Sequence, residues 1–129
     1  MIKINKGDGK HKVTLIAIRS GEDTSVIIYG GEKPHIGAVA VSIARPSLEN
    51  LNKISSSTSV FTFIGHKEDE IAKEVAESIT KATKRNTVAI IGLHIERATK
   101  EDINCLVYNI KEVVKQLKKN FQNNINCKF

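Results

Sequence analysis

The spacing of apolar and polar residues divides much of the chain into short strands. Residues 11–19 are rich in β-branched and aliphatic side chains, and residues 24–29 return after the turn signal of residues 20–23. This pattern predicts a β-hairpin. Residues 36–44 and 87–95 are apolar on both faces, which is typical of strands in the middle of a sheet.

A change to a helical period marks two predicted helices. Residues 60–64 predict one more short strand, after which residues 68–84 place their apolar side chains on one stripe. Thr99 and Asp102 have the spacing of a capping box, which predicts the start of a long amphipathic helix.

The order of these elements, β-β-β-β-α-β-α, predicts a single α+β domain over residues 1–129. Successive hairpin strands should pair antiparallel, and the β-α-β crossover should make its two strands parallel. We therefore expect a two-layer sandwich, in which a mixed, mostly antiparallel sheet carries both helices on one face. Residues 45–59 predict a polar loop, and residues 119–129 predict a frayed tail.

Two helices cover only one face of such a sheet. The strands predicted at residues 36–44 and 87–95 are apolar on their other face too. An exposed apolar face of that extent is uncommon on a monomer, so the sequence predicts a homodimer.

Composition favours a reduced, cytoplasmic protein. No apolar run reaches the length of a membrane span, and the N-terminus lacks the apolar block of a signal peptide. The cysteines, Cys105 and Cys127, do not form a C-x-x-C metal pair. The net charge of +6 is spread along the chain, and no aromatic-studded strand of the RNA-binding type is present. We therefore expect neither a membrane nor a specific nucleic acid as partner.

Three of the four histidines stand beside glycines at the ends of predicted strands. His35 precedes its strand, His66 follows the next, and His94 lies near the end of a strand parallel to the second. If these strands are neighbours, the three histidines share one edge of the sheet, within about 10 Å. Together with Glu96 they form a suitable ligand set for zinc, manganese or iron.

Each histidine also has an ordinary structural interpretation. His66 would cap a helix, His94 would be a core residue, and His35 would be a turn residue after Pro34. The clustering favours a functional site, because binding sites bring histidines and carboxylates together.

Two other features suit an anionic ligand. Gly65 and the helix start after His66 would present backbone N–H groups, and Lys67 would add charge, although Glu68 and its acidic neighbours oppose a bare phosphate. At the opposite edge, Arg45 with nearby hydroxyls would hold a phosphate or belong to an ordinary solvated loop. Only a dimer that brings one subunit's loop to the other's histidines would merge the two features.

The same segments resemble the LpdD-like family. The runs GGEKPHIGAVAVS, GHKEDEIA and GLHIERATKEDI carry the resemblance, with the shorter RPSL and SSTSV, over most of residues 30–103. These small proteins accompany gallate-type and other phenolic-acid decarboxylases that depend on prenylated flavin. The chain has Glu96 where the family pattern favours Asp, which keeps the carboxylate but lengthens it.

The resemblance implies a chaperone that binds prenylated FMN or FMN, together with a divalent metal, and serves the catalytic subunit of a flavin-dependent decarboxylase. By motif match, His35, His66 and His94 would contact the metal or the cofactor, with Lys67 and Glu68 beside them. The predicted cofactor set also includes Gly31, Pro34, Gly65 and Arg45, and the predicted metal set also includes Glu96.

Two other classes of function stay open. A small metal-dependent enzyme would use a water bound by the same histidines. A purely structural assembly factor would bind neither metal nor flavin. The chain lacks a nucleophile arranged with a base, which favours a binding protein over an independent enzyme.

Overall fold

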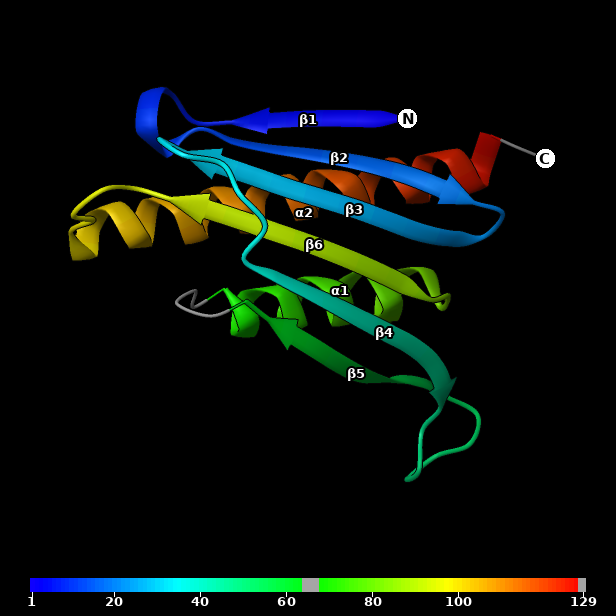
Figure 1. Ribbon diagram of the computed structural model, residues 1–129. Coiled ribbons are helices and arrows are strands. Elements are labelled where there is room, and N and C mark those ends of the chain that lie inside the picture. The colour runs from blue at the N-terminus through cyan, green and yellow to red at the C-terminus, as the bar shows by residue number, and fades with distance from the viewer. Residues whose placement is uncertain (64–67, 128–129) are drawn as a thin grey trace.

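The computed structural model describes residues 1–63 and 68–127, and Figure 1 shows how its elements are arranged. The strands are β1 (Ile2–Lys6), β2 (Val13–Ser20), β3 (Asp23–Gly31), β4 (Ala38–Pro46), β5 (Ile54–Thr62) and β6 (Thr87–His94). The helices are α1 (Asp69–Thr83), α2 (Lys100–Cys127) and the short 3-10 helix η1 (Gly9–His11).

All these strands form one sheet in the order β1-β2-β3-β6-β4-β5. β3 pairs parallel with β6, and the other neighbouring pairs are antiparallel. The predicted α+β class with a mixed, mostly antiparallel sheet is therefore confirmed. β5 and β6 run in the same direction, because both pair antiparallel with β4, which lies between them.

One pairing expected from the sequence is wrong. β4 does not pair with β3, since β6 is inserted between them. β6 is apolar on both faces, and such a strand is most stable when other strands flank it on both edges. The site prediction required the strands next to the three histidines to be neighbours. They are, because β4 lies between β6 and β5.

The sequence pattern did not predict β1, and it predicted β5 shorter than it is. Ile4 of β1 is 8% exposed and belongs to the core, although the segment around it is polar. β5 begins at Ile54 rather than at residue 60, and it pairs with β4 along the whole length of that strand, with its serines opposite residues 41 and 43–45. Ladder hydrogen bonds to β4 outweigh the modest strand propensity of serine, which depends strongly on context.

The core lies between the sheet and the helix layer. Both helices lie behind the sheet in Figure 1, where α1 packs on β4, β5 and β6, and α2 packs on β1 and β2. Ala38, Ala40 and Ser42 of β4 are fully buried, and the Thr80 hydroxyl of α1 donates to the Ser42 carbonyl at 3.3 Å. Small residues on this strand thus let α1 approach closely.

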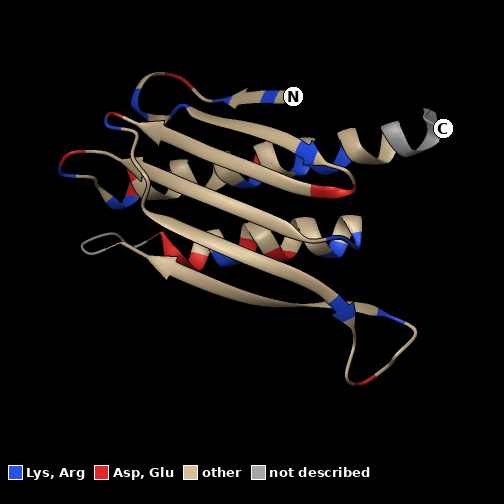
Figure 2. Cartoon of the chain, turned by 45° about the vertical axis from the view of Figure 1, so that its right-hand side comes forward, with Lys and Arg blue, Asp and Glu red and all other residues tan. Residues whose placement is uncertain are grey.

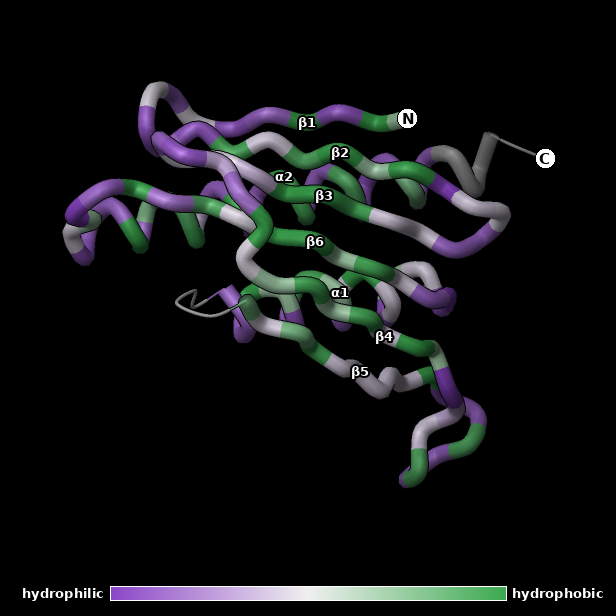
Figure 3. The backbone as a smooth tube through the Cα atoms, in the orientation of Figure 1, coloured by the Kyte–Doolittle hydropathy of each residue, from purple (hydrophilic) through white to green (hydrophobic). Residues whose placement is uncertain are grey.

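Charged residues gather on helices, turns and loops, whereas the strands carry few of them (Figure 2). Hydrophobic residues instead follow the middle of β2, β3, β6 and β4 (Figure 3). Within the described chain, no helix combines the length and the apolar character needed to cross a membrane.

α2 continues to Cys127, past residue 119, where the sequence predicted fraying. Phe121 is only 5% exposed, and the Arg19 guanidinium lies 4.7 Å from the centre of its ring. The asparagine-rich end of α2 has a low intrinsic helix stability. Burial of the Phe121 ring stabilises these last turns.

Candidate functional site

His35 and His94 meet at one end of the sheet, which we call the histidine end. His35 lies in the connection between β3 and β4, and His94 is the last residue of β6. Their ring centres are 6.1 Å apart, with the ring planes 74° apart. The third predicted histidine, His66, lies outside the described residues, as do Gly65 and Lys67.

Each of these two histidines contacts a carboxylate. His35 Nε2 lies 3.1 Å from Glu68 Oε1, and both side chains are largely buried. His94 Nε2 lies 2.9 Å from Glu96 Oε2, at a more exposed position. The hydrogen bond from His94 and the nearby positive charge of Lys33 lower the pKa of Glu96 below its ordinary value.

Two glycines permit this close packing. A side chain at Gly92 of β6 would collide with the His35 carbonyl, and one at Gly37 would collide with the Glu68 carboxylate. Gly31 pairs with His94 at the end of the β3–β6 ladder, and the His94 carbonyl accepts N–H groups of the two residues that follow Gly31, at 2.7 and 3.2 Å. The β3–β4 connection is therefore fastened to the end of β6.

A groove of about 460 Å³ opens beside the histidine end, between the start of α1, the end of β6 and α2. Its polar lining consists of Glu68, Glu70, Glu74, His94 and Lys111. Its apolar lining consists of Ile71, Leu93, Ile103, Leu106, Val107 and Ile110. This combination of apolar walls with a few polar groups is typical of a small-molecule site.

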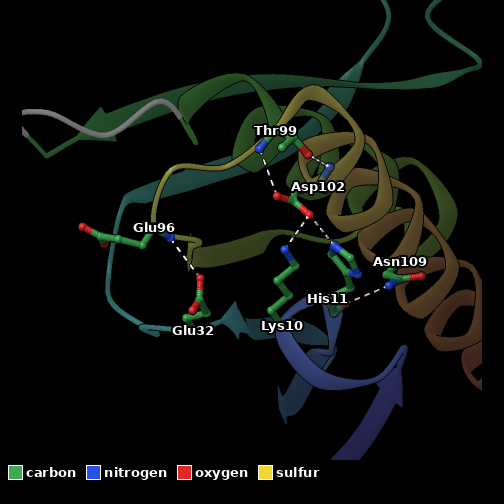
Figure 4. Close-up of polar contacts among 7 residues, drawn as sticks. All are labelled: Lys10, His11, Glu32, Glu96, Thr99, Asp102 and Asn109. Carbon is green, nitrogen blue, oxygen red and sulfur yellow. Dashed lines mark hydrogen bonds and ion pairs between the residues drawn. The ribbon is translucent and has the colours of Figure 1, made fainter.

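A second polar cluster fixes the loop after β6 to the N-terminal segment (Figure 4). Asp102 accepts the Thr99 N–H at 2.9 Å and Thr99 Oγ1 accepts the Asp102 N–H at 3.0 Å, which is the predicted capping box. Asp102 Oδ1 also lies 2.8 Å from His11 Nε2 and 3.2 Å from Lys10 Nζ. Asn109 donates to the His11 carbonyl at 2.8 Å.

We did not predict these contacts of His11 and Lys10 from the sequence. The capping box identified Asp102, but its remaining partners come from η1, about ninety residues earlier in the chain. The backbone N–H of Thr99, followed by His11, holds the pKa of Asp102 well below its ordinary value. These partners therefore stabilise the ionised form of Asp102 at a largely buried position.

Only part of the predicted cofactor set comes together within one chain. Arg45 lies at the other end of β4. Its Nε donates to Ser57 Oγ at 2.7 Å and its Nη1 to the Pro46 carbonyl at 3.0 Å. The length of β4 separates it from the histidine end by about 24 Å. A cofactor contact by Arg45 thus remains a prediction that requires the second subunit of a dimer.

The metal also remains a prediction. Among the described residues, no group of three His, Cys, Asp or Glu side chains is placed to hold a metal ion. His35 and His94 are each engaged with a carboxylate instead, and His66 lies outside the described part.

Comparison with known proteins decides the family. Residues 7–122 match the prenylated flavin chaperone LpdD-like domain. The chain belongs to this family. No curated protein matches it. Among solved structures, a chain from a crystal structure of a chaperone complex for yeast 20S proteasome assembly is similar, with 14% identity, a TM-score of 0.53 and 95% of each chain covered. At that identity the likeness shows the fold alone, so this LpdD-like chain shares its architecture with an assembly chaperone.

Proposed function

We propose that this protein holds prenylated flavin in the groove beside the histidine end and passes it to a flavin-dependent decarboxylase. One observation carries the proposal: in a chain of the prenylated flavin chaperone family, a ligand-sized groove includes two of the predicted site residues, Glu68 and His94. The cofactor supplies the decarboxylation chemistry in its enzyme, whereas the residues of this chain bind and orient it.

The apolar walls suit the flat ring system of a flavin. Ile103 of α2 is 52% exposed, so a bound ring would remove apolar surface from water at a gain of about 25 cal/mol per Å². Leu93 and Ile71 face the same groove from β6 and α1. Prenylation adds apolar carbons to the flavin, so these walls favour the prenylated form over plain FMN.

The polar end supplies partners for the ring edge. Glu68 Oε2 is buried, and no donor among the described residues reaches it. The Glu68 carboxylate lines the groove, and by turning from the β3–β4 connection toward the ligand it would accept a hydrogen bond from a flavin N–H. The imidazole of His94, held in place by Glu96, would donate or accept beside it.

The phosphate needs a different position. Glu68, Glu70 and Glu74 line one side of the groove and would repel it. Lys111 of α2 lines the same groove and supplies a compensating positive charge. The proposed orientation therefore points the ring edge at Glu68 and the phosphate at Lys111.

Binding to two variants of the same helix tests this site. Ile103→Glu places a carboxylate against the apolar wall, while Cys105→Glu places one on an exposed position of α2 that does not line the groove. We expect Ile103→Glu to weaken anaerobic binding of enzymatically prepared prenylated FMN at least about tenfold, or about 1.4 kcal/mol, and Cys105→Glu to leave it unchanged. Equal binding by both variants would place the cofactor elsewhere.

Transfer to the partner needs its own measurement. We expect the loaded protein to restore activity to a decarboxylase stripped of cofactor faster than an equal amount of free prenylated FMN. If the loaded protein retains the cofactor and the enzyme stays inactive, the protein is a store rather than a delivery factor.

A further inference from the structure

A continuous row of apolar side chains crosses the sheet on the face opposite the helices. The strand registers align Ile16 with Ile27, Ile27 with Ile90, Ile90 with Val39 and Val39 with Phe61. This row spans β2, β3, β6, β4 and β5, and we call it the apolar row. On β2, β3, β4 and β6 its members alternate with buried residues, so they point away from the helices, and Phe61 shares their face as the direct partner of Val39.

The neighbouring positions on this face are apolar or small. The adjacent register aligns Ile18, Ser25, Val88, Val41 and Ser59. Neither this register nor the apolar row contains a charged side chain. Phe61 is 67% exposed, Ile18 48% and Ile27 38%, although the helices bury the other face of the same strands.

We infer that a second copy of this chain covers the apolar row, with the two sheets packed face to face. Side chains on facing sheets interdigitate across about 10 Å, and the small Ser25 and Ser59 leave room for larger residues of the partner. An uncharged surface is self-complementary, because it needs no opposite charge on its partner. A two-fold axis in the interface would bring the same row of both copies together.

The size of the face fits a modest homodimer. Five strands span about 20 Å across the sheet, and along β4 and β5 the exposed apolar positions run from Ile43, opposite Ser57, to Phe63, which is about 20 Å. Each copy would bury on the order of 400–500 Å², so that both together approach the lower limit of about 1,000 Å² for a specific interface. The groove lies on the helix side and stays open in such a dimer, so this inference does not depend on the proposed function.

Ile27→Lys is the decisive variant, because it places a charge in the middle of the apolar row. Leu48→Lys is the matched control, since Leu48 is 86% exposed in the loop between β4 and β5 and lies outside the row. We expect light scattering at high micromolar concentration to give twice the 14.2 kDa chain mass for the wild type and for Leu48→Lys. Ile27→Lys should give the mass of one chain.

Phe61→Lys guards against a variant that fails to fold, because Phe61 is highly exposed at the end of the row. Circular dichroism and melting curves should show both row variants folded, with the dimer constant of Phe61→Lys weakened at least about tenfold. A wild-type monomer at high micromolar concentration would overturn the inference. A dimer that persists unchanged in both folded variants would overturn it as well, because it would place the contact on another surface.

Discussion

At the scale of single residues, side chains far apart in sequence meet in two clusters. Asp102 joins the capping box of α2 to His11 and Lys10 of η1. His35 and His94 meet at the histidine end, each beside its own carboxylate. In the first cluster the Asp102 carboxylate is largely buried and its partners are partly exposed, whereas the second cluster borders the groove.

Asp102→Asn tests the first cluster through its pH dependence. The pKa of Asp102 is lowered in the folded protein, so its ionised form stabilises the fold fully above the ordinary aspartate pKa of about 3.9. That stabilisation is lost as the pH falls through the lowered pKa. We expect the wild type to lose stability more steeply than Asp102→Asn as the pH falls below about 4.

Urea unfolding across this pH range measures the difference. Glu101→Gln is the control, because Glu101 is exposed on the same turn of α2. Parallel pH profiles for the wild type and Asp102→Asn would mean that the Asp102 contacts contribute no net stability.

Lys111→Ala tests the proposed orientation of the cofactor. Without the positive charge, we expect binding of FMN to weaken several-fold, while riboflavin, which lacks the phosphate, binds as before. Calorimetry with both ligands measures the two effects. An equal loss for both ligands would assign Lys111 to the ring rather than to the phosphate.

The metal content of His94→Ala tests the predicted metal, whatever this variant does to cofactor binding. His94 is substantially exposed, so we expect its removal to leave the melting temperature nearly unchanged. If the metal prediction is right, elemental analysis will show stoichiometric metal in the wild type and none in His94→Ala. Metal occupancy should also fall below about pH 6.5, because a ligating imidazole must be neutral. A wild type without bound metal would end this prediction and leave the flavin proposal intact.

At the scale of elements, α2 connects the groove to the far end of the molecule. Its first turns line the groove, and its later turns carry Phe121 beneath the N-terminal half of the sheet. A helix end with four asparagines after residue 119 has little intrinsic stability, so packing decides its length.

Phe121→Ala should release this end of α2. We expect a loss of about 3 kcal/mol in the free energy of unfolding, together with faster amide exchange after residue 117. Asn120→Ala, at an exposed neighbouring position, should change neither. Unchanged exchange in Phe121→Ala would mean that the end of α2 is stable without this anchor.

At the scale of the whole molecule, the sheet separates two surfaces with different roles. The groove lies on the helix side, and the apolar row lies on the open side. Because each surface uses its own residues, cofactor binding and dimerisation are expected to be independent.

Ile27→Lys measures that independence. We expect the monomeric variant to bind prenylated FMN within about twofold of the wild type. A variant that loses the cofactor together with the dimer would mean that the partner subunit completes the site, as the predicted contribution of Arg45 would require.

The sequence alone determined the α+β class, both helices and most strands, because apolar periodicity and turn residues act over a few positions. It also placed His35 and His94 at strand ends that turned out to be neighbours. Only the tertiary structure decided that β6 separates β3 from β4, that Ser55 to Ser59 belong to β5, and that Ile4 joins the core. The pairings of His35 with Glu68 and of His11 with Asp102 were decided at the same level. These features depend on contacts between distant segments, and local propensity does not encode which distant segment becomes the partner.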